Sequence, residues 1–480
     1  MHTMRARAFL LLVAGLLLGG GLFTLTSQDG QAAPPAVAAA TASPPSTTAP
    51  AAPPTLAPPP APEPTAAPAE VAPPPPPSLT QRVDALLADP ALAGVAFGIA
   101  VRDEAGRPVL ERGGAAALLP ASTVKQATAA AALGRLGAGF RFTTRVVAPA
   151  GPTPDGTLNG DLVLVGSGDP ALATETFRGQ VSPERPATPL EALADQIAAR
   201  GIRRITGGVL GDPTVFAHQP LASGWRPRYL EELDATYTSG LTVDAGRKLF
   251  VEGGKLRAVA SPDPASEAAA ALLTALRNRG VQVDGGVATV TAPTQHGLIL
   301  ASVQSPPLDE LLRWMVQRSD NHIADALFRT LGATAGDATW TGAEAATRAA
   351  LAPLGLDWTG VRLADGSGLS RDDRIPADFL AALDAAVMRT PSAERWASWQ
   401  AVAGESGTLR KRLRGTLAEH RLRGKTGSLE DVRALAGSVS GPVLPRSRCS
   451  ASVPRSRLRS VPLSPATACQ LAQRSADGVR

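Results

Sequence analysis

Ser122-Thr123-Val124-Lys125 opens an alanine-rich run that stops before Gly137, and it is the most informative stretch of this 480-residue chain. The run predicts a helix over residues 122–136 with a glycine stop. A spacing of three residues puts the serine and the lysine on one face of that helix. A serine hydroxyl is a poor nucleophile until a base removes its proton, and a desolvated lysine can be that base. Taken alone, the motif is common, and a surface lysine remains the alternative.

Lysine is rare in this chain, which makes each one a candidate for chemistry. Arginine stays charged at any usable pH, whereas a lysine removed from water can lose its proton. Two of the five lysines fall in short motifs of the kind found at active sites. The five are Lys125, Lys248, Lys255, Lys411 and Lys425.

A second motif, Ser319-Asp320-Asn321, lies between two predicted helices at residues 308–318 and 323–331. A break between helices can direct side chains into a cleft. Helix capping by the serine or the aspartate is the alternative when the motif is considered alone. The chain has only three asparagines, Asn159, Asn278 and Asn321. An asparagine at this position of the motif is therefore less easily a coincidence.

A third motif, Lys425-Thr426-Gly427, lies on a strand predicted over residues 423–428. The glycine allows a substrate backbone to approach closely, and the lysine and threonine can hold a carboxylate. The alternative is an exposed lysine on a strand.

Together and in this order, the three motifs resemble those of the active-site-serine enzymes that recognise penicillin. The 197 residues from Ser122 to Ser319 exceed what a β-lactamase-like domain needs, so a long insertion is implied. This arrangement resembles the D-alanyl-D-alanine carboxypeptidase/endopeptidase family, the low-molecular-mass class C penicillin-binding proteins of peptidase family S13. Residues 160–170, 365–371 and 311–325 are also similar to the family, and the resemblance covers roughly residues 79–441.

The expected fold class is α+β, because helices alternate irregularly with short strands. The resemblance implies a β-lactamase/transpeptidase-like domain, an antiparallel sheet flanked by helices. Residues 79–160 and 305–442 would form this catalytic domain. A large inserted domain, residues 161–304, would separate the first and second active-site motifs.

The resemblance also implies a mechanism on peptidoglycan peptides. Ser122 would attack the carbonyl of a terminal D-alanyl-D-alanine bond, with Lys125 as its base. Ser319 would relay a proton to the leaving amine. Asn321 would bind the substrate backbone or orient Lys125. Water would then release the acyl-enzyme.

The third motif would complete the site. Lys425 would act on the relay serine and on the substrate carboxylate, which Thr426 would hold beside Gly427. The backbone N–H groups of Ser122 and Ser428 would form the oxyanion hole. The resemblance implies no metal and no cofactor. It implies β-lactam antibiotics as covalent inhibitors and peptidoglycan stem peptides as substrates.

Two other functions are alternatives to a carboxypeptidase. A class A β-lactamase would need a glutamate-bearing loop ending in leucine–asparagine, and no such run occurs here. A non-catalytic wall-binding or penicillin-sensing module is the other alternative, and the intact motifs argue against it. Sequence alone does not separate carboxypeptidase from endopeptidase activity, since one acyl-enzyme serves both.

The N-terminal region predicts export. Arg5 and Arg7 precede an apolar run over residues 8–25, so residues 1–31 are expected to be a cleaved signal peptide or a membrane anchor. Residues 32–78 hold 18 of the 44 prolines and are expected to form an extended linker. The expected location is therefore extracytoplasmic, in the cell-wall space, secreted or anchored, with membrane contact only through the N-terminal segment.

Residues 443–480 differ in character from the body that precedes them. Seven arginines and one acid give this tail a charge of +6, so the remainder of the +5 chain carries −1. Without a basic face, nucleic acid is not an expected partner. Both cysteines, Cys449 and Cys469, lie in this tail, which shows no strand-like apolar alternation and contains Pro445 and Pro454. We hypothesise an out-of-frame or natural disordered extension, in which case the next strand and the closing helix would be missing.

Overall fold

The computed structural model describes residues 77–294, 296–441 and 447–454. The predicted signal segment and almost all of the predicted linker lie outside these residues. From Ser78 onward, all described residues belong to one compact unit. None of the described helices is both long enough and apolar enough to span a membrane.

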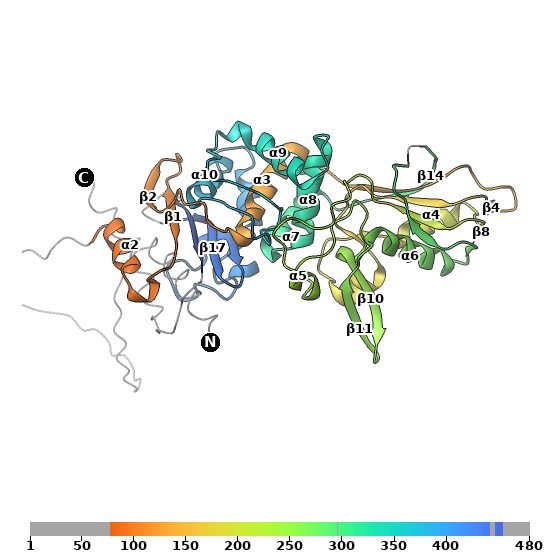
Figure 1. Cartoon of the computed structure of the whole chain (residues 1–480), viewed down its shortest axis with the longest axis horizontal. Coiled ribbons are helices and arrows are strands. Elements are labelled where there is room, and N and C mark those ends of the chain that lie inside the picture. The colour runs from red at the N-terminus through yellow and green to blue at the C-terminus, as the bar shows by residue number, and fades with distance from the viewer. Residues whose placement is uncertain (1–76, 295, 442–446, 455–480) are drawn as a thin grey trace, which may run out of the picture. The chain divides into compact units, whose positions relative to one another are not determined.

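A six-stranded antiparallel sheet carries the third motif (Figure 1). Its strand β17 (Val432–Val439) pairs with β16 (Leu422–Ser428) on one side and with β18 (Ser447–Pro454) on the other. The strand β1 (Gly98–Arg102) lies beyond β18. Seven of the eight residues of β17 are buried, as expected for a strand covered on both faces. In spatial order the strands are β15 (Ala401–Val402), β16 (Leu422–Ser428), β17 (Val432–Val439), β18 (Ser447–Pro454), β1 (Gly98–Arg102) and β2 (Pro108–Arg112).

Helices form a core on one face of this sheet. The first of them, α3 (Val124–Leu136), has no charged residue except Lys125 and Arg135. Its small alanines let it pack closely against α8 (Asn321–Thr334) and α9 (Trp340–Leu351). On the other face, α2 (Leu79–Leu87) contributes Val83 to a second apolar cluster. The helices of the first core are α3 (Val124–Leu136), α7 (Leu308–Arg318), α8 (Asn321–Thr334), α9 (Trp340–Leu351), α10 (Ala377–Val387) and α11 (Ala393–Trp399).

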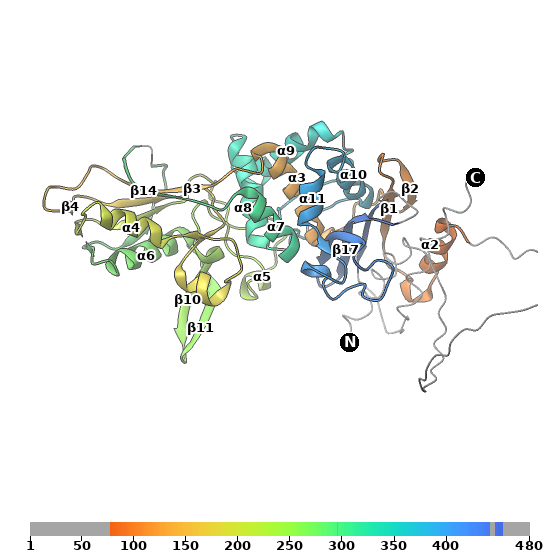
Figure 2. The same cartoon turned by 180° about the vertical axis from the view of Figure 1, so that it is seen from behind.

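A second, five-stranded sheet lies between the first and second motifs in the chain (Figure 2). Its helices α4 (Glu191–Ala199) and α6 (Pro264–Arg277) bury their apolar faces against it. The strands in order are β13 (Val287–Thr289), β9 (Val209–Asp212), β5 (Leu162–Val165), β3 (Thr143–Ala148) and β14 (Leu298–Gln304).

Smaller elements complete this second region. The hairpin of β10 (Arg247–Glu252) and β11 (Lys255–Ala260) projects beside α6 (Figure 1). The remaining short elements are β4 (Thr157–Leu158), β6 (Leu172–Ala173), β7 (Thr188–Pro189), β8 (Arg204–Ile205), α5 (Arg228–Glu231) and β12 (Gln282–Val283).

The chain enters and leaves this second region by neighbouring strands. β3 is its first strand and β14 its last, and the two pair antiparallel over residues 143–148 and 298–304. Such adjacent ends are typical of an inserted domain. We propose an inserted domain here, as the sequence suggested. Because β3 belongs to its sheet, a boundary before residue 143 fits the strand pairing better than residue 161.

The predicted α+β class is confirmed, and the elements around the motifs lie close to their predicted positions. The helix predicted from residue 122 begins as a 3-10 turn, Ala121–Thr123, and continues as α3. It ends as predicted before Gly137, whose φ is 79°. The strand predicted over residues 423–428 is β16, and β17 follows it.

The structure contradicts one consequence of the hypothesis about residues 443–480, namely that the next strand is missing. Ser447–Pro454 form β18, which pairs with β17 over eight register pairs and with β1 over five. The edges of β17 and β1 flank β18 and pair with it. This pairing, rather than the strand's own apolar pattern, fixes its place. Pro454 is the last residue of the strand, where it disturbs the pairing least. Cys469 and the positions where a closing helix would follow lie outside the described residues.

Candidate active site

The side chains of the first motif are in contact at the start of α3. Lys125 is fully buried, whereas Ser122 is partly accessible. The Lys125 Nζ lies 3.0 Å from Ser122 Oγ, 2.6 Å from Asn321 Oδ1 and 2.6 Å from the Ser367 carbonyl oxygen. The 3-10 turn before α3 therefore presents the serine hydroxyl directly to the amine.

This geometry suits a neutral lysine. A neutral amine has two N–H groups, which can donate hydrogen bonds to the oxygens of Asn321 and Ser367. Its lone pair then remains free to accept the hydroxyl proton of Ser122. Burial lowers the pKa of Lys125 to about 8, and nearby carboxylates, Asp325 foremost, oppose that change. Desolvation thus creates a base that can work near neutral pH.

The second motif forms the junction between two helices. Helix α7 ends at Arg318, and the next residue, Ser319, adopts a left-handed conformation with a φ of 61°. Asp320 caps α8, and its Oδ1 accepts the N–H of Ile323 at 2.9 Å. The capping alternative therefore holds for Asp320, while the same break directs Ser319 and Asn321 toward the lysines.

Asn321 links the first motif to the insertion. Its Oδ1 accepts from Lys125, and its Nδ2 donates to the carbonyl oxygen of Asp234 at 2.8 Å. Because both ends of the amide are engaged, its rotation is fixed and its oxygen must face the lysine.

The third motif meets the second across the site. The Lys425 Nζ lies 2.9 Å from Ser319 Oγ and 2.7 Å from the Thr426 carbonyl oxygen. Burial lowers the pKa of Lys425 well below its usual value, and the charges of Lys125 and Arg412 lower it further. The Thr426 hydroxyl donates to Thr408 Oγ1 at 2.9 Å.

Gly427 is required by the protein's own backbone. A Cβ at this position would lie 2.6 Å from the Pro120 carbonyl oxygen and 3.1 Å from the Cβ of Ala121. The expectation was that this glycine admits a substrate backbone. The structure gives a further reason, since β16 passes directly against the turn that carries Ser122.

An open cleft of about 400 Å³ is lined by residues of the first two motifs and by Ser428, which follows the third. Ser122, Ser319, Asn321 and the exposed Ser428 all line it. Its other walls come from the proposed insertion, from the loop at residues 365–371 and from the loop after the third motif: Arg228, Tyr229, Glu232, Asp234, Leu369, Leu429 and Glu430. Lys125 and Lys425 lie buried beneath these residues and touch the two serines. The structure therefore brings six of the predicted site residues to one place: Ser122, Lys125, Ser319, Asn321, Lys425 and Ser428.

Comparison with known protein families matches residues 79–252 and 247–443 to the D-Ala-D-Ala carboxypeptidase 3 (S13) family. The chain belongs to this family. The match ends at the start of the tail that the sequence marks as unusual.

Curated relatives of this S13 chain carry names in agreement. It is 33% identical over 437 residues to a D-alanyl-D-alanine carboxypeptidase of Actinomadura sp. (strain R39), covering 76% of this chain and 79% of the relative. It is 35% identical over 447 residues to carboxypeptidase DacB of Mycolicibacterium smegmatis, covering 92% and 90%.

Among solved structures, penicillin binding protein 4 (dacB) from Haemophilus influenzae matches with a TM-score of 0.68. The identity is 23%, and the match covers 79% of this chain and 95% of that one. At this identity the likeness shows the fold, and it supports the transpeptidase-like architecture expected from the motifs.

The sequence assigned no role to the loop at residues 365–371, which contacts Lys125. The Ser367 carbonyl accepts from Lys125, and Asp365 folds the loop around it. Asp365 accepts the N–H groups of Ser367 at 3.0 Å, Gly368 at 2.6 Å and Ser370 at 2.7 Å. The similarity of residues 365–371 to the S13 family was the only signal, and it assigned no role.

Two further buried aspartates lie around this loop. Asp325 Oδ1 accepts the N–H of Gly366 at 3.0 Å, and Asp373 Oδ1 accepts that of Ala364 at 2.7 Å. Burial raises the pKa of both carboxyl groups well above the usual value, and the neighbouring Asp365 adds to the effect. In the described part of the chain, no cluster of His, Cys, Asp and Glu is arranged to hold a metal ion.

Proposed function

We propose that the chain is a serine-type D-Ala-D-Ala carboxypeptidase that also binds β-lactams. The observation that carries this proposal is the contact of the buried Lys125 amine with Ser122 Oγ at 3.0 Å. Membership of the S13 family and the carboxypeptidase names of the relatives support the reaction and the substrate class.

Acylation would begin at Ser122. Its oxygen bonds to the carbonyl carbon of the penultimate D-alanine while its proton passes to the neutral amine of Lys125. The carbon–nitrogen bond then breaks. The proton returns to the leaving amine through the hydroxyl of Ser319, which Lys425 orients from 2.9 Å.

The oxyanion would be held by two backbone N–H groups, those of Ser122 and Ser428. Both residues line the cleft. The terminal carboxylate would lie against Thr426 and Lys425, on the opposite side of the scissile bond from the acyl group. Asn321 would position Lys125 through its Oδ1 contact of 2.6 Å.

Deacylation would restore the enzyme. Water loses a proton to neutral Lys125 and attacks the ester carbonyl, the ester bond to Ser122 breaks, and the serine regains its proton. A β-lactam would acylate Ser122 by opening its ring, and its leaving group would stay attached. The Haemophilus influenzae relative has been solved in complex with a β-lactam, which supports this class of inhibitor.

We further propose that the protein works outside the cytoplasm, on cell-wall peptidoglycan, exported by its N-terminal segment. The apolar run over residues 8–25 after two arginines supports this location. Fractionation of cells that express the full chain tests it, and a purely cytoplasmic protein would contradict it.

The first experiment is labelling of the purified protein with a fluorescent penicillin, beside a Ser122→Ala variant. We expect a covalent label on the wild-type protein and none on the variant. A second assay follows release of D-alanine from a peptide ending in D-Ala-D-Ala. Folded wild-type protein that neither labels nor releases D-alanine would favour a non-catalytic wall-binding module.

A further inference from the structure

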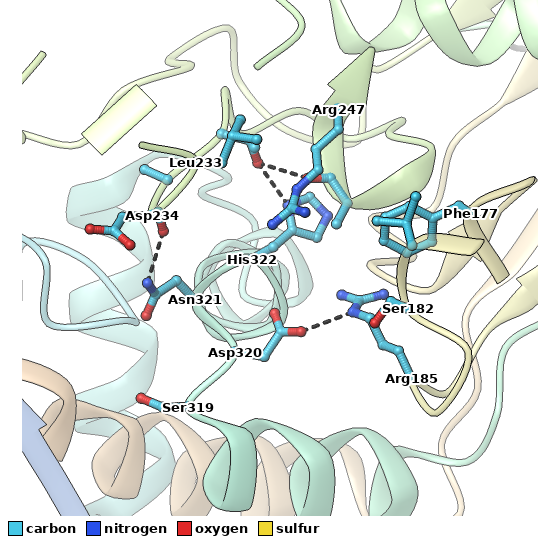
Figure 3. Close-up of a pocket in the computed structure, with 14 residues that line it drawn as sticks. Phe177, Ser182, Arg185, Leu233, Asp234, Arg247, Ser319, Asp320, Asn321 and His322 are labelled. Atoms are coloured by element: carbon cyan, nitrogen blue, oxygen red, sulfur yellow. Dashed lines mark hydrogen bonds and ion pairs between the residues drawn. The ribbon is translucent and has the colours of Figure 1, made fainter. Parts of the chain in front are cut away.

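A second pocket, of about 240 Å³, adjoins the catalytic cleft on the far side of Asn321 (Figure 3). Ser319, Asn321 and Asp234 line both cavities. The remaining walls come from α8 and from the insertion, and they include two arginines, Arg185 and Arg247. None of the mechanistic steps above uses this pocket.

Arg185 has an unused donor in this pocket. The residue is 7% exposed. Its Nε donates to Asp320 Oδ2 at 2.9 Å, and its Nη1 donates to the Pro170 carbonyl oxygen at 3.0 Å. Its Nη2 is buried and has no hydrogen-bond partner among the described residues. A guanidinium cannot release its charge, and a buried donor without an acceptor is unfavourable.

Arg247 presents a second guanidinium to the same space. Its Nε is also buried and lacks a hydrogen-bond partner within the described part of the chain. Burial lowers the pKa of Arg247, which Arg185 lowers further and Asp320 opposes. Figure 3 shows both guanidinium groups directed toward the space between Phe177, Asp320 and His322.

The hydrogen-bond donors facing this space outnumber its free acceptors. Asp320 lines the pocket with the two arginines, and its oxygens already accept from Ile323, Arg185 and Trp314. Burial lowers the pKa of His322 to about 3, so this ring is neutral. Asp234 stands at the rim, where burial and Glu232 raise the pKa of its carboxyl group. Two buried guanidinium N–H groups, at Arg185 Nη2 and Arg247 Nε, therefore remain without an acceptor among the described residues.

We propose that this pocket binds a carboxylate carried by the part of the substrate beyond the scissile bond. A planar carboxylate matches the fork of N–H groups that two guanidinium groups offer. The volume equals about eight waters of roughly 30 Å³ each, enough for one short acidic side chain. This inference rests on the proposed function, because Ser319 places the pocket beside the leaving amine.

The consequence concerns substrate choice. A single D-alanine has only the terminal carboxylate, which Thr426 and Lys425 are proposed to hold. A leaving group with a second carboxylate, such as the acidic residue of a cross-linked peptide, would fill the pocket as well. The site would then favour cleavage of cross-links over removal of a terminal D-alanine.

The test compares two peptides with the same acyl part, one releasing D-glutamate and the other D-glutamine. A charge-assisted hydrogen bond is strong enough for a preference of about tenfold or more in kcat/KM for the acid. We expect this preference in the wild-type protein and its loss in Arg247→Gln. The matched control is Arg257→Gln, which removes the same charge from exposed β11 in the same hairpin and should keep the preference.

A second arm uses free glutarate, at constant ionic strength set by chloride. Glutarate should raise the unfolding temperature of the wild-type protein and of Arg257→Gln, but not of Arg247→Gln. A glutarate effect without a peptide preference would support a carboxylate site that takes free acids. Penicillin labelling of each variant checks that it is folded.

Absence of both the preference and the glutarate effect in a protein that still releases D-alanine would overturn the carboxylate pocket. The same holds if Arg247→Gln keeps both. Failure of D-alanine release and of penicillin labelling would instead overturn the proposed function, and the glutarate arm would still decide the pocket because it needs no turnover.

Discussion

The amine of Lys125 and the side-chain oxygen of Asn321 lie 2.6 Å apart, although 196 positions of the chain separate the two residues. The other end of the asparagine amide is held by the carbonyl of Asp234, within the proposed insertion. The orientation of the base thus depends on the insertion as well as on the catalytic helices.

Replacing this asparagine should slow acylation. In Asn321→Ala the amine loses one of its two fixed acceptors, and Lys125 can turn away from Ser122. We expect the rate of penicillin labelling to fall about 10- to 100-fold, because a misplacement of ~1 Å in a reacting group can cost about 10²-fold. Asn278→Ala is the control, because Asn278 is exposed at the end of α6. Equal rates for both variants would contradict the role of Asn321.

The pH dependence of acylation should follow the amine of Lys125. With a pKa near 8, this group is mostly protonated at pH 7 and mostly neutral at pH 9. A base must be neutral to act, so the labelling rate should rise about tenfold per pH unit below 8 and level off above it. A stopped-flow profile from pH 6 to 9.5 measures this, and a flat profile would rule out Lys125 as the titrating base.

A lysine that cannot lose its proton should fail as a base. Lys125→Arg keeps the positive charge, but a guanidinium stays protonated at every usable pH. We expect labelling to drop by about 10²- to 10⁴-fold. Lys248→Arg makes the same exchange at an exposed position of β10 and should leave the rate unchanged. A Lys125→Arg protein that labels normally would show that the proton leaves Ser122 by another route.

Gly427 should not tolerate a side chain. Its Cβ would meet the Pro120 carbonyl oxygen at 2.6 Å, and a backbone atom cannot move aside as a flexible side chain can. We expect Gly427→Ala to lower the free energy of unfolding by about 1–3 kcal/mol and to reduce labelling. Gly139→Ala is the control, because nothing lies within 4 Å of its added Cβ. Denaturant unfolding of both variants gives the comparison.

The sequence was sufficient to predict the reactive side chains of the candidate site. Ser122 and Lys125 are linked by local helical spacing, and the other two motifs stood out because lysine and asparagine are rare. The carbonyl groups of Ser367 and Asp234 could not be predicted, since every residue has one and only the fold selects which is used. The strand β18 was missed for a related reason, because its position is fixed by its neighbours rather than by its own apolar pattern.

The strand β18 should be needed for a working site despite its unusual sequence. A chain that ends at Ser440 leaves the facing edges of β17 and β1 without thirteen register pairs, eight from one strand and five from the other. Unpaired backbone groups within a sheet are costly, and open edges promote aggregation. Because β17 holds β16, which carries Lys425, we expect this shorter chain to be insoluble or unlabelled by penicillin. A chain that ends at Pro454 retains every described strand and should label. Full labelling of the chain ending at Ser440 would show that the site assembles without β18.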